Sequence, residues 1–279
     1  MRPFHVGISD LSFADEVRSL QAIPVLALKE FSWSGLGELP IETYLETKEP
    51  YGLLMNRLFH EGELAEVKRV LDLLLKHLPE RLYFSDFSVA ELCEEPLRQR
   101  LCYKPETVMT NAADATVLYE AGIPSVSVSP LLSIHELEAF CAGFPHAELT
   151  IHGHLLMSVS DRHLLSAWAA RYGIALPEGE LSLKETTRDE FFPVRETSSG
   201  FLIFTDYVQE SFRWLRRLET AGAESFYIDS SFLLKEEVLE ALRIYRSLLE
   251  GTEEAEAIAT YRAAYPKVQE GYYEQETIL

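Results

Sequence analysis

Short β-rich runs alternate with amphipathic helical segments along most of this chain, and this alternation constrains the fold more than any other feature of the sequence. Such a pattern predicts parallel strands joined by crossover helices. From residues 4–8 to residues 225–228 there are about eight strands in βα order. Eight such units favour a closed (β/α)8 TIM-like barrel over an open sheet, and 279 residues are enough for an architecture that typically needs about 250.

The clearest single element is a helix expected over residues 61–78, where apolar residues recur with a period of about 3.6 residues. They are Leu64, Val67, Val70, Leu71, Leu74, Leu75 and Leu78. The same analysis predicts a strand over residues 106–110 and a helix over residues 209–221.

Two segments depart from the plain barrel pattern. Residues 181–205 hold two β-rich runs around Ser198-Ser199-Gly200, which predicts a β-hairpin insertion before the last βα unit. The tail, about residues 255–279, carries four tyrosines, which favours docking onto the body or onto a partner. No linker or repeat divides the chain, so one domain over residues 1–279 is expected.

The formal net charge of −20 argues against this chain binding RNA or DNA by itself, because such binding draws on Lys and Arg that neutralise phosphates. Residues 213–217 bring two or three basic residues together, a spacing that favours a solvated helix face. No apolar run reaches the roughly 18 residues that span a bilayer. Residues 1–8 lack the apolar core of a signal peptide. We therefore expect a cytoplasmic protein with no membrane partner.

Polar residues that follow the predicted strands form the candidate binding site, because barrel function lies at the carboxyl ends of the strands. They are Asn56, His60, Asp86, Asn111, Ser129 and Asp229, together with Asp10 and Lys29. Each is also a residue type that forms helix caps or turns, and capping is an equal alternative at Asp86, Asn111 and Asp229.

His152 and His154 are the sharpest local feature. Residues two apart on a strand point to one face, so both imidazoles could bind one metal ion. A catalytic zinc needs a third protein ligand, for which His163, Asp161 or Glu148 are available. The alternative, which we favour, is a hydrogen-bonded histidine pair at a pocket mouth, with no metal.

Several motifs in order along the chain resemble the U32 peptidase family. They are YGLLMNRLFHEGEL at 51–64, SVSVSPLLSIHELEAF at 125–140, LSLK at 181–184, FPV at 192–194, AGAESFYID at 221–229 and YR at 245–246. The family signature, E-x-x-x-HG-x-x-C-x-x-x-S-x-x-C-x-x-S, corresponds to Glu148, His152-Gly153, Ser160 and Ser166. The resemblance also implies a barrel.

The cysteines are where the chain departs from that family. The two signature cysteines correspond to Leu156 and His163. Family members that hydroxylate RNA bases or quinone precursors are associated with an iron–sulfur cluster, and a thiolate-held cluster needs about four cysteines. Cys93, Cys102 and Cys141 fit no metal-ligand spacing and are best interpreted as small buried hydrophobes. No cofactor is therefore expected in this chain, with zinc at His152 and His154 as the alternative.

Three functions follow from the resemblance and the residues. The first is a cluster-less partner subunit of a longer, cysteine-bearing U32 protein in tRNA wobble-uridine hydroxylation, with RNA contacted only through that partner. The second is a self-sufficient peptidase or other hydrolase with His152, His154, Asp229 and Glu148 as catalytic residues. The third is a small-molecule-binding barrel without chemistry, with a pocket lined by Trp33, Phe59 and Phe87.

Overall fold

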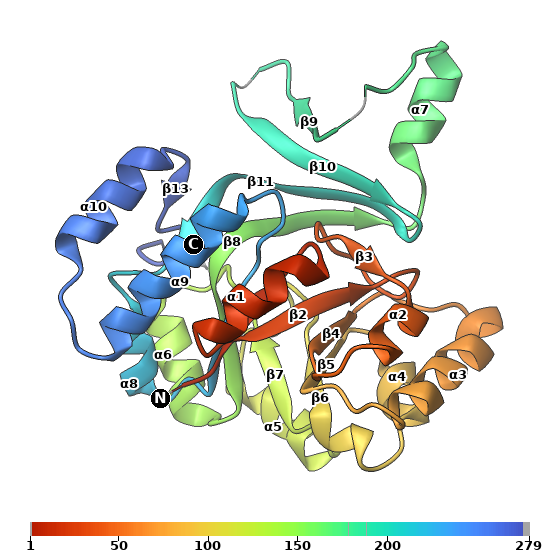
Figure 1. Ribbon diagram of the computed structural model, residues 1–279, viewed down its shortest axis with the longest axis horizontal. Coiled ribbons are helices and arrows are strands. Elements are labelled where there is room, and N and C mark those ends of the chain that lie inside the picture. The colour runs from red at the N-terminus through yellow and green to blue at the C-terminus, as the bar shows by residue number, and fades with distance from the viewer. Residues whose placement is uncertain (1, 178, 188, 276–279) are drawn as a thin grey trace.

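A closed barrel of eight parallel strands forms the centre of the computed structural model, which describes residues 2–177, 179–187 and 189–275 (Figure 1). The barrel strands are β1 (Phe4–Gly7), β2 (Ile23–Leu28), β4 (Gly52–Met55), β5 (Arg81–Phe84), β6 (Leu101–Tyr103), β7 (Ser125–Val128), β8 (Ala147–Ser160) and β12 (Ser225–Ile228). Each strand is parallel to its neighbour, and β12 pairs with both β1 and β8, which closes the barrel. The predicted (β/α)8 barrel is confirmed.

Helices surround the barrel and bury their apolar stripes against it (Figure 1). They are α1 (Ala14–Ser19), α2 (Ile41–Leu45), α3 (Leu64–Leu74), α4 (Phe87–Leu92), α5 (Ala112–Glu120), α6 (Ile134–Gly143), α8 (Leu215–Ala221) and α9 (Lys235–Leu249), with 3-10 turns η1 (Leu11–Phe13), η2 (Glu61–Glu63) and η3 (Leu97–Arg100). In α3 the predicted stripe is buried at Val67, Val70, Leu71 and Leu74, although the helix ends earlier than residue 78. Among the described residues, no helix is long and apolar enough to cross a membrane.

Two predicted elements are wrong. The fifth barrel strand is β6 rather than residues 106–110, because Glu106 adopts a φ of 61° and turns the chain away from the barrel there. The predicted helix over residues 209–221 begins only at Leu215. Gln209 remains extended because it pairs with Gly153 of β8 and with Gln269 of the short strand β13 (Val268–Gln269).

The predicted hairpin is part of a larger protrusion. β8 continues past the barrel rim and pairs antiparallel with β11 (Gly200–Glu210), which pairs with β10 (Phe191–Thr197), and β10 with β9 (Leu181–Lys184). Helix α7 (Leu164–Tyr172) connects β8 to β9. We call the described part of residues 156–204 the arm. In Figure 1, α7 and β9 lie at its far end, away from the barrel helices.

The turn between β10 and β11 returns to the barrel and is fastened to it. The Trp33 indole donates to the Ser199 carbonyl oxygen at 3.2 Å, and Arg195 Nη1 donates to the Leu36 carbonyl oxygen at 3.0 Å. The short strand β3 (Glu38–Leu39), which pairs with β2, follows Leu36. These contacts hold the base of the arm over the loops at the carboxyl ends of the barrel strands.

The C-terminal segment packs on the body, one of the two locations that its tyrosines predict. It comprises α10 (Ala255–Ala264) and β13, which pairs with β11 (Figure 1). Tyr261 and Tyr273 are fully buried. Burial of two large aromatic side chains stabilises this docking.

Candidate functional site

The barrel mouth holds a buried ammonium group that the sequence analysis missed. Lys104 follows β6 and is only 5% exposed, with its Nζ 3.4 Å from Glu106 Oε2 and 4.7 Å from the centre of the Tyr227 ring. Burial alone would lower the pKa of Lys104, but the carboxylates of Glu106 and Asp229 outweigh it and raise that pKa. Lys104 is therefore a charged group at the place where barrel enzymes act.

Asn56 occupies the same mouth with its hydrogen bonds already used. Its Nδ2 donates to the Trp33 carbonyl oxygen and to Glu106 Oε1, both at 3.1 Å, and its Oδ1 accepts from the Trp33 N–H at 3.0 Å. Asp229, which lines the same cavity, accepts from the Ser231 N–H at 2.8 Å. The cavity among these side chains has a volume of about 20 Å³, room for about one water molecule. This cavity itself is too small for a nucleobase, and a groove of about 300 Å³ that shares Trp33 and Glu106 with it lies beside it.

Glu148 lies at the opposite end of the barrel from this mouth, near the start of β8, where it is fully buried. Its Oε2 accepts from three groups, Arg81 Nη1 at 2.9 Å, Ser225 Oγ at 2.9 Å and Tyr83 Oη at 3.0 Å, and His5 Nδ1 lies 2.7 Å from it. Burial would raise the pKa of Glu148, but His5 and Arg81 lower it to about 2. This cluster ties four strands of the barrel together and is separate from the mouth.

His152 lies between the barrel and helices α9 and α10. A register shift between β8 and β12, where Tyr227 pairs with Thr150 but Ile228 pairs with His152, places its ring there. Its Nδ1 is 3.3 Å from Tyr245 Oη, and its Nε2 is 3.0 Å from Tyr261 Oη. Burial lowers the pKa of His152 to about 3, so the ring is neutral at pH 7.

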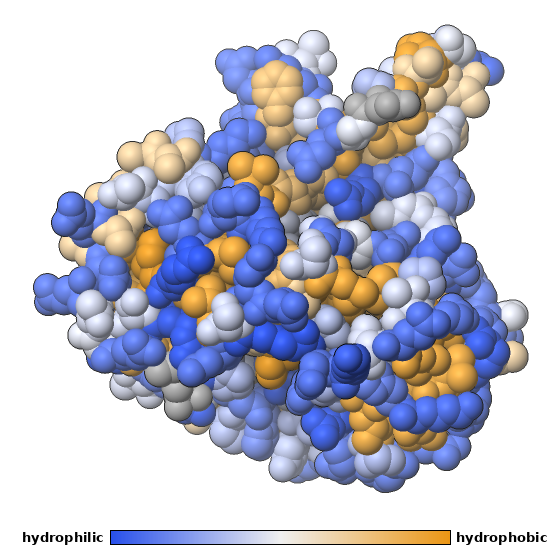
Figure 2. All heavy atoms as spheres, viewed as in Figure 1, coloured by the Kyte–Doolittle hydropathy of each residue, from blue (hydrophilic) through white to orange (hydrophobic). Residues whose placement is uncertain are grey.

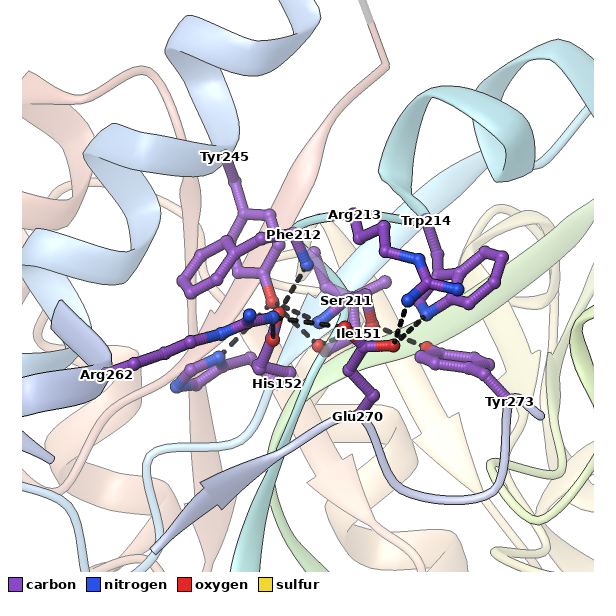
Figure 3. Close-up of polar contacts among 11 residues, drawn as sticks. Ile151, His152, Ser211, Phe212, Arg213, Trp214, Tyr245, Arg262, Glu270 and Tyr273 are labelled. Carbon is purple, nitrogen blue, oxygen red and sulfur yellow. Dashed lines mark hydrogen bonds and ion pairs between the residues drawn. The ribbon is translucent and has the colours of Figure 1, made fainter. Parts of the chain in front are cut away.

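Figure 3 shows the network around this histidine, which reaches the C-terminal segment. Tyr245 Oη accepts from the Ser211 N–H and donates to the Ile151 carbonyl oxygen, both at 2.9 Å (Figure 3). Since the single Tyr245 proton is engaged there, His152 Nδ1 acts as the donor to Tyr245. Both ring nitrogens are thus engaged by tyrosines, in a network that joins β8, β11, α9 and α10.

His154 lies beside the mouth and also lines a larger outer pocket of about 510 Å³. Its Nδ1 donates to the Thr205 carbonyl oxygen at 2.7 Å, which leaves Nε2 as the acceptor of a neutral ring. Burial lowers the pKa of His154. The pocket lies between the arm and the C-terminal segment, and its other walls include Phe191, Pro193, Phe232, Glu237, Tyr265 and Lys267. Burial raises the pKa of Glu237 to about 6.

The other candidate residues are spread around the barrel, mostly at helix starts. Asp86 and Asn111 cap α4 and α5, where their side chains accept from the Ser88 and Asp114 N–H groups. His60 begins η2 in a capping box with Glu63. His163, exposed, precedes α7, and Ser129, buried, follows β7.

The aromatic residues expected to line one pocket have different neighbours. Trp33 lines the mouth cavity. Phe59 packs on Phe31 with ring centres 5.9 Å apart, and Phe87 stacks on Tyr103 at 5.0 Å. The outer pocket is built from other residues, which come from the arm, from the C-terminal segment and from residues 232–237 around the start of α9.

The thiols do not fit an iron–sulfur cluster. Cys93, Cys102 and Cys141 are buried at the end of α4, in β6 and in α6. Burial raises the pKa of each thiol to about 12, whereas a cluster binds thiolates. Among residues 2–177, 179–187 and 189–275, no group of three or more His, Cys, Asp or Glu side chains is placed to hold a metal ion.

Comparisons with known proteins place the chain in a family. The model of peptidase family U32 matches residues 26–276. The tRNA hydroxylation protein P2 of Bacillus subtilis (strain 168) is 22% identical over 244 residues, which cover 80% of this chain and 79% of that protein. The solved U32 peptidase Mk0906 is 12% identical, with a TM-score of 0.49 over 82% of this chain and 92% of its own. A chitinase from Chromobacterium violaceum ATCC 12472 is 10% identical, with a TM-score of 0.43 over 88% and 99%. Because the family model spans most of the sequence, the chain belongs to peptidase family U32.

Proposed function

We propose that this chain is a cluster-less partner subunit of a longer, cysteine-bearing U32 protein in the hydroxylation of tRNA wobble uridine. Family membership and the relative named tRNA hydroxylation protein P2 supply the reaction class. The partner supplies the iron–sulfur cluster and the contacts with RNA. The complex of the two chains acts in the cytoplasm, where tRNA is modified.

The observation that carries this proposal is the state of the three thiols. They are buried in separate elements, and none corresponds to a signature cysteine of the family. A chain that retains the family barrel but offers no thiolate set needs another chain to hold a cluster.

The net charge of the chain and the volume of its mouth cavity support the same assignment of roles to the two subunits. A net charge of −20 repels RNA, so a basic partner is needed to hold it. The cavity of about 20 Å³ beside Lys104 is too small for a flipped-out base, which a base-modifying enzyme must accommodate.

The alternative, a self-sufficient hydrolase, is less well supported. It needs His152, His154, Asp229 and Glu148 to act on one substrate. Glu148 lies near the start of β8, where its carboxylate accepts three hydrogen bonds, and both nitrogens of His152 contact tyrosines. His154 and Asp229 share the mouth, which is filled by neighbouring side chains.

Co-expression with a longer, cysteine-bearing U32 protein from the same organism tests the proposal. We expect the purified complex to contain iron, the chain alone to contain none, and hydroxylated wobble uridine to form only when both chains are present. Cys93→Ala with Cys141→Ala should leave the iron content of the complex unchanged. Stoichiometric iron or zinc in the wild-type chain alone would contradict the proposal.

A further inference from the structure

The arm carries most of the exposed large apolar side chains of the described residues. Among the described residues, eight of the fourteen strongly exposed large apolar side chains lie in the arm. They are Met157, Val159, Leu164, Trp168, Tyr172, Ile174, Leu183 and Phe191. Figure 2 shows apolar residues gathered on α7 at the upper right of the view. Such a concentration on a protrusion marks an interaction surface.

Helix α7 presents part of this surface in a fixed orientation. Leu164, Trp168 and Tyr172 recur every four residues, so they share one face, and the rings of Trp168 and Tyr172 lie 5.7 Å apart. The neighbouring side of the helix is buried at Ala169. The helix start is held by Glu196 of β10, whose carboxylate accepts from the Leu165 N–H at 2.8 Å and the Ser166 N–H at 3.1 Å. A preorganised stripe of this kind costs little entropy on binding.

A second apolar strip lies just before α7 in the chain. Met157 and Val159 are two residues apart on β8 and share one face, which forms a wall of a groove of about 300 Å³. The opposite wall comes from the barrel rim and includes Leu58, Tyr103 and Val108. Along the chain, only residues 160–163 lie between these β8 residues and the stripe. The two together offer a partner both a cleft and a ridge.

The charges at this surface indicate which partner fits it. In residues 161–174, two arginines against one aspartate give a net charge of +1, within a chain of net charge −20. A dimer of this chain through the arm would place the arginines of one copy against those of the other and would bring two strongly acidic bodies together. The acidic body also repels nucleic acid and anionic lipid surfaces. The complement is a protein with an apolar groove rimmed by acidic side chains and a basic surface elsewhere.

We infer that the arm face made of the α7 stripe (Leu164, Trp168 and Tyr172) and the β8 groove is the docking surface for the basic partner subunit. This inference rests on the proposed function, because the partner is the longer U32 protein named there. Trp168 and Tyr172 are the anchors, since large aromatic side chains dominate binding energy at such surfaces. Arg162 and Arg171 pair with the acidic rim of the partner.

A double variant with a matched control tests the inference. We expect Trp168→Ser with Tyr172→Ser to weaken binding to the longer U32 protein by about 100-fold in isothermal titration calorimetry. The control is Val117→Ser with Leu234→Ser, which removes two equally exposed apolar side chains, 64% and 66% exposed, from the body. Its Kd should stay within about threefold of wild type. Circular dichroism and thermal unfolding of each variant check the fold.

The outcomes separate the arm from the proposed function. If the longer protein binds wild type and the arm variant equally, the arm inference is overturned while the partner role stands. If it binds neither, both fail. Concentration-dependent dimerisation of wild type that the arm variant abolishes, or arm-dependent binding to anionic vesicles, would assign the surface to another occupant and overturn the inference. Arg162→Glu with Arg171→Glu keeps the apolar stripe, and we expect it to slow association by about tenfold.

Discussion

The barrel and the arm differ in which side chains they bury and which they expose. In the barrel, Glu148 is fully buried and its Oε2 has three hydrogen-bond donors and the His5 ring within 3.0 Å. In the arm, Trp168 is 50% exposed and Tyr172 66% exposed. The barrel thus uses its polar groups for its own stability, whereas the arm leaves large apolar groups exposed to solvent.

This difference explains where new contacts can form. A barrel whose mouth holds about one water molecule has little space for a ligand, although barrel enzymes usually act there. The arm and the C-terminal segment, both added to the barrel, provide the outer pocket and the exposed apolar face. Substitutions in the two regions should accordingly affect different properties.

The largest effect is expected in the barrel, from Glu148→Ala. Removal of the carboxylate leaves Arg81 without its buried partner, so the free energy of unfolding should fall by about 3–5 kcal/mol. Urea unfolding followed by circular dichroism measures this. The arm substitution Trp168→Ser should change the same quantity by less than about 0.5 kcal/mol. Equal losses for the two variants would remove the contrast between barrel and arm.

A medium effect is expected from pH, through His152. The unfolded histidine titrates near 6.5, whereas burial lowers the pKa of folded His152 to about 3. Between these values the unfolded chain takes up a proton that the folded chain does not. The stabilisation is therefore complete above pH 6.5 and is lost as the pH falls, by about 1.4 kcal/mol per pH unit.

The measurement is urea unfolding from pH 6.5 to pH 4.5. The pKa of Glu148 is lowered from 4.5 to about 2 in the folded chain, so Glu148 affects the free energy of unfolding only below this pH range. The variant His152→Gln lacks the titrating ring. The difference in slope between wild type and variant isolates His152 from other groups. Parallel slopes would show that His152 does not titrate differently in the folded and unfolded chains.

The smallest effect is expected at the base of α7, from Glu196→Ala. This change removes the acceptor for the Leu165 and Ser166 N–H groups and should destabilise α7 by about 1 kcal/mol. Amide hydrogen exchange in α7 should become about fivefold faster, with barrel amides unchanged. Glu190→Ala, an exposed acid of the same arm, is the control. Faster exchange throughout the barrel would mean that the arm and barrel unfold as one unit.

The candidate site was predicted less completely than the fold. Asp86 and Asn111 proved to be helix caps, one of the two interpretations open for them. Lys104 and Glu106 were missed because the fifth barrel strand was expected at residues 106–110. The signal for the true strand was present in Leu101-Cys102-Tyr103, a short apolar run. It was weaker than the β-branched run that follows, and propensity in such short runs is easily overridden by tertiary context.

The sequence by itself determined the βα order, the stripe of α3 and the family, because these depend on local periodicity and on residues in linear order. Only the tertiary structure decided that Glu148 faces three hydrogen-bond donors, that His152 lies among tyrosines and that the cavity beside Lys104 is nearly filled. Those outcomes depend on which side chains from distant segments meet, and on a register shift in β8. Neither leaves a periodic signal, since contacts across a barrel join residues far apart in the chain.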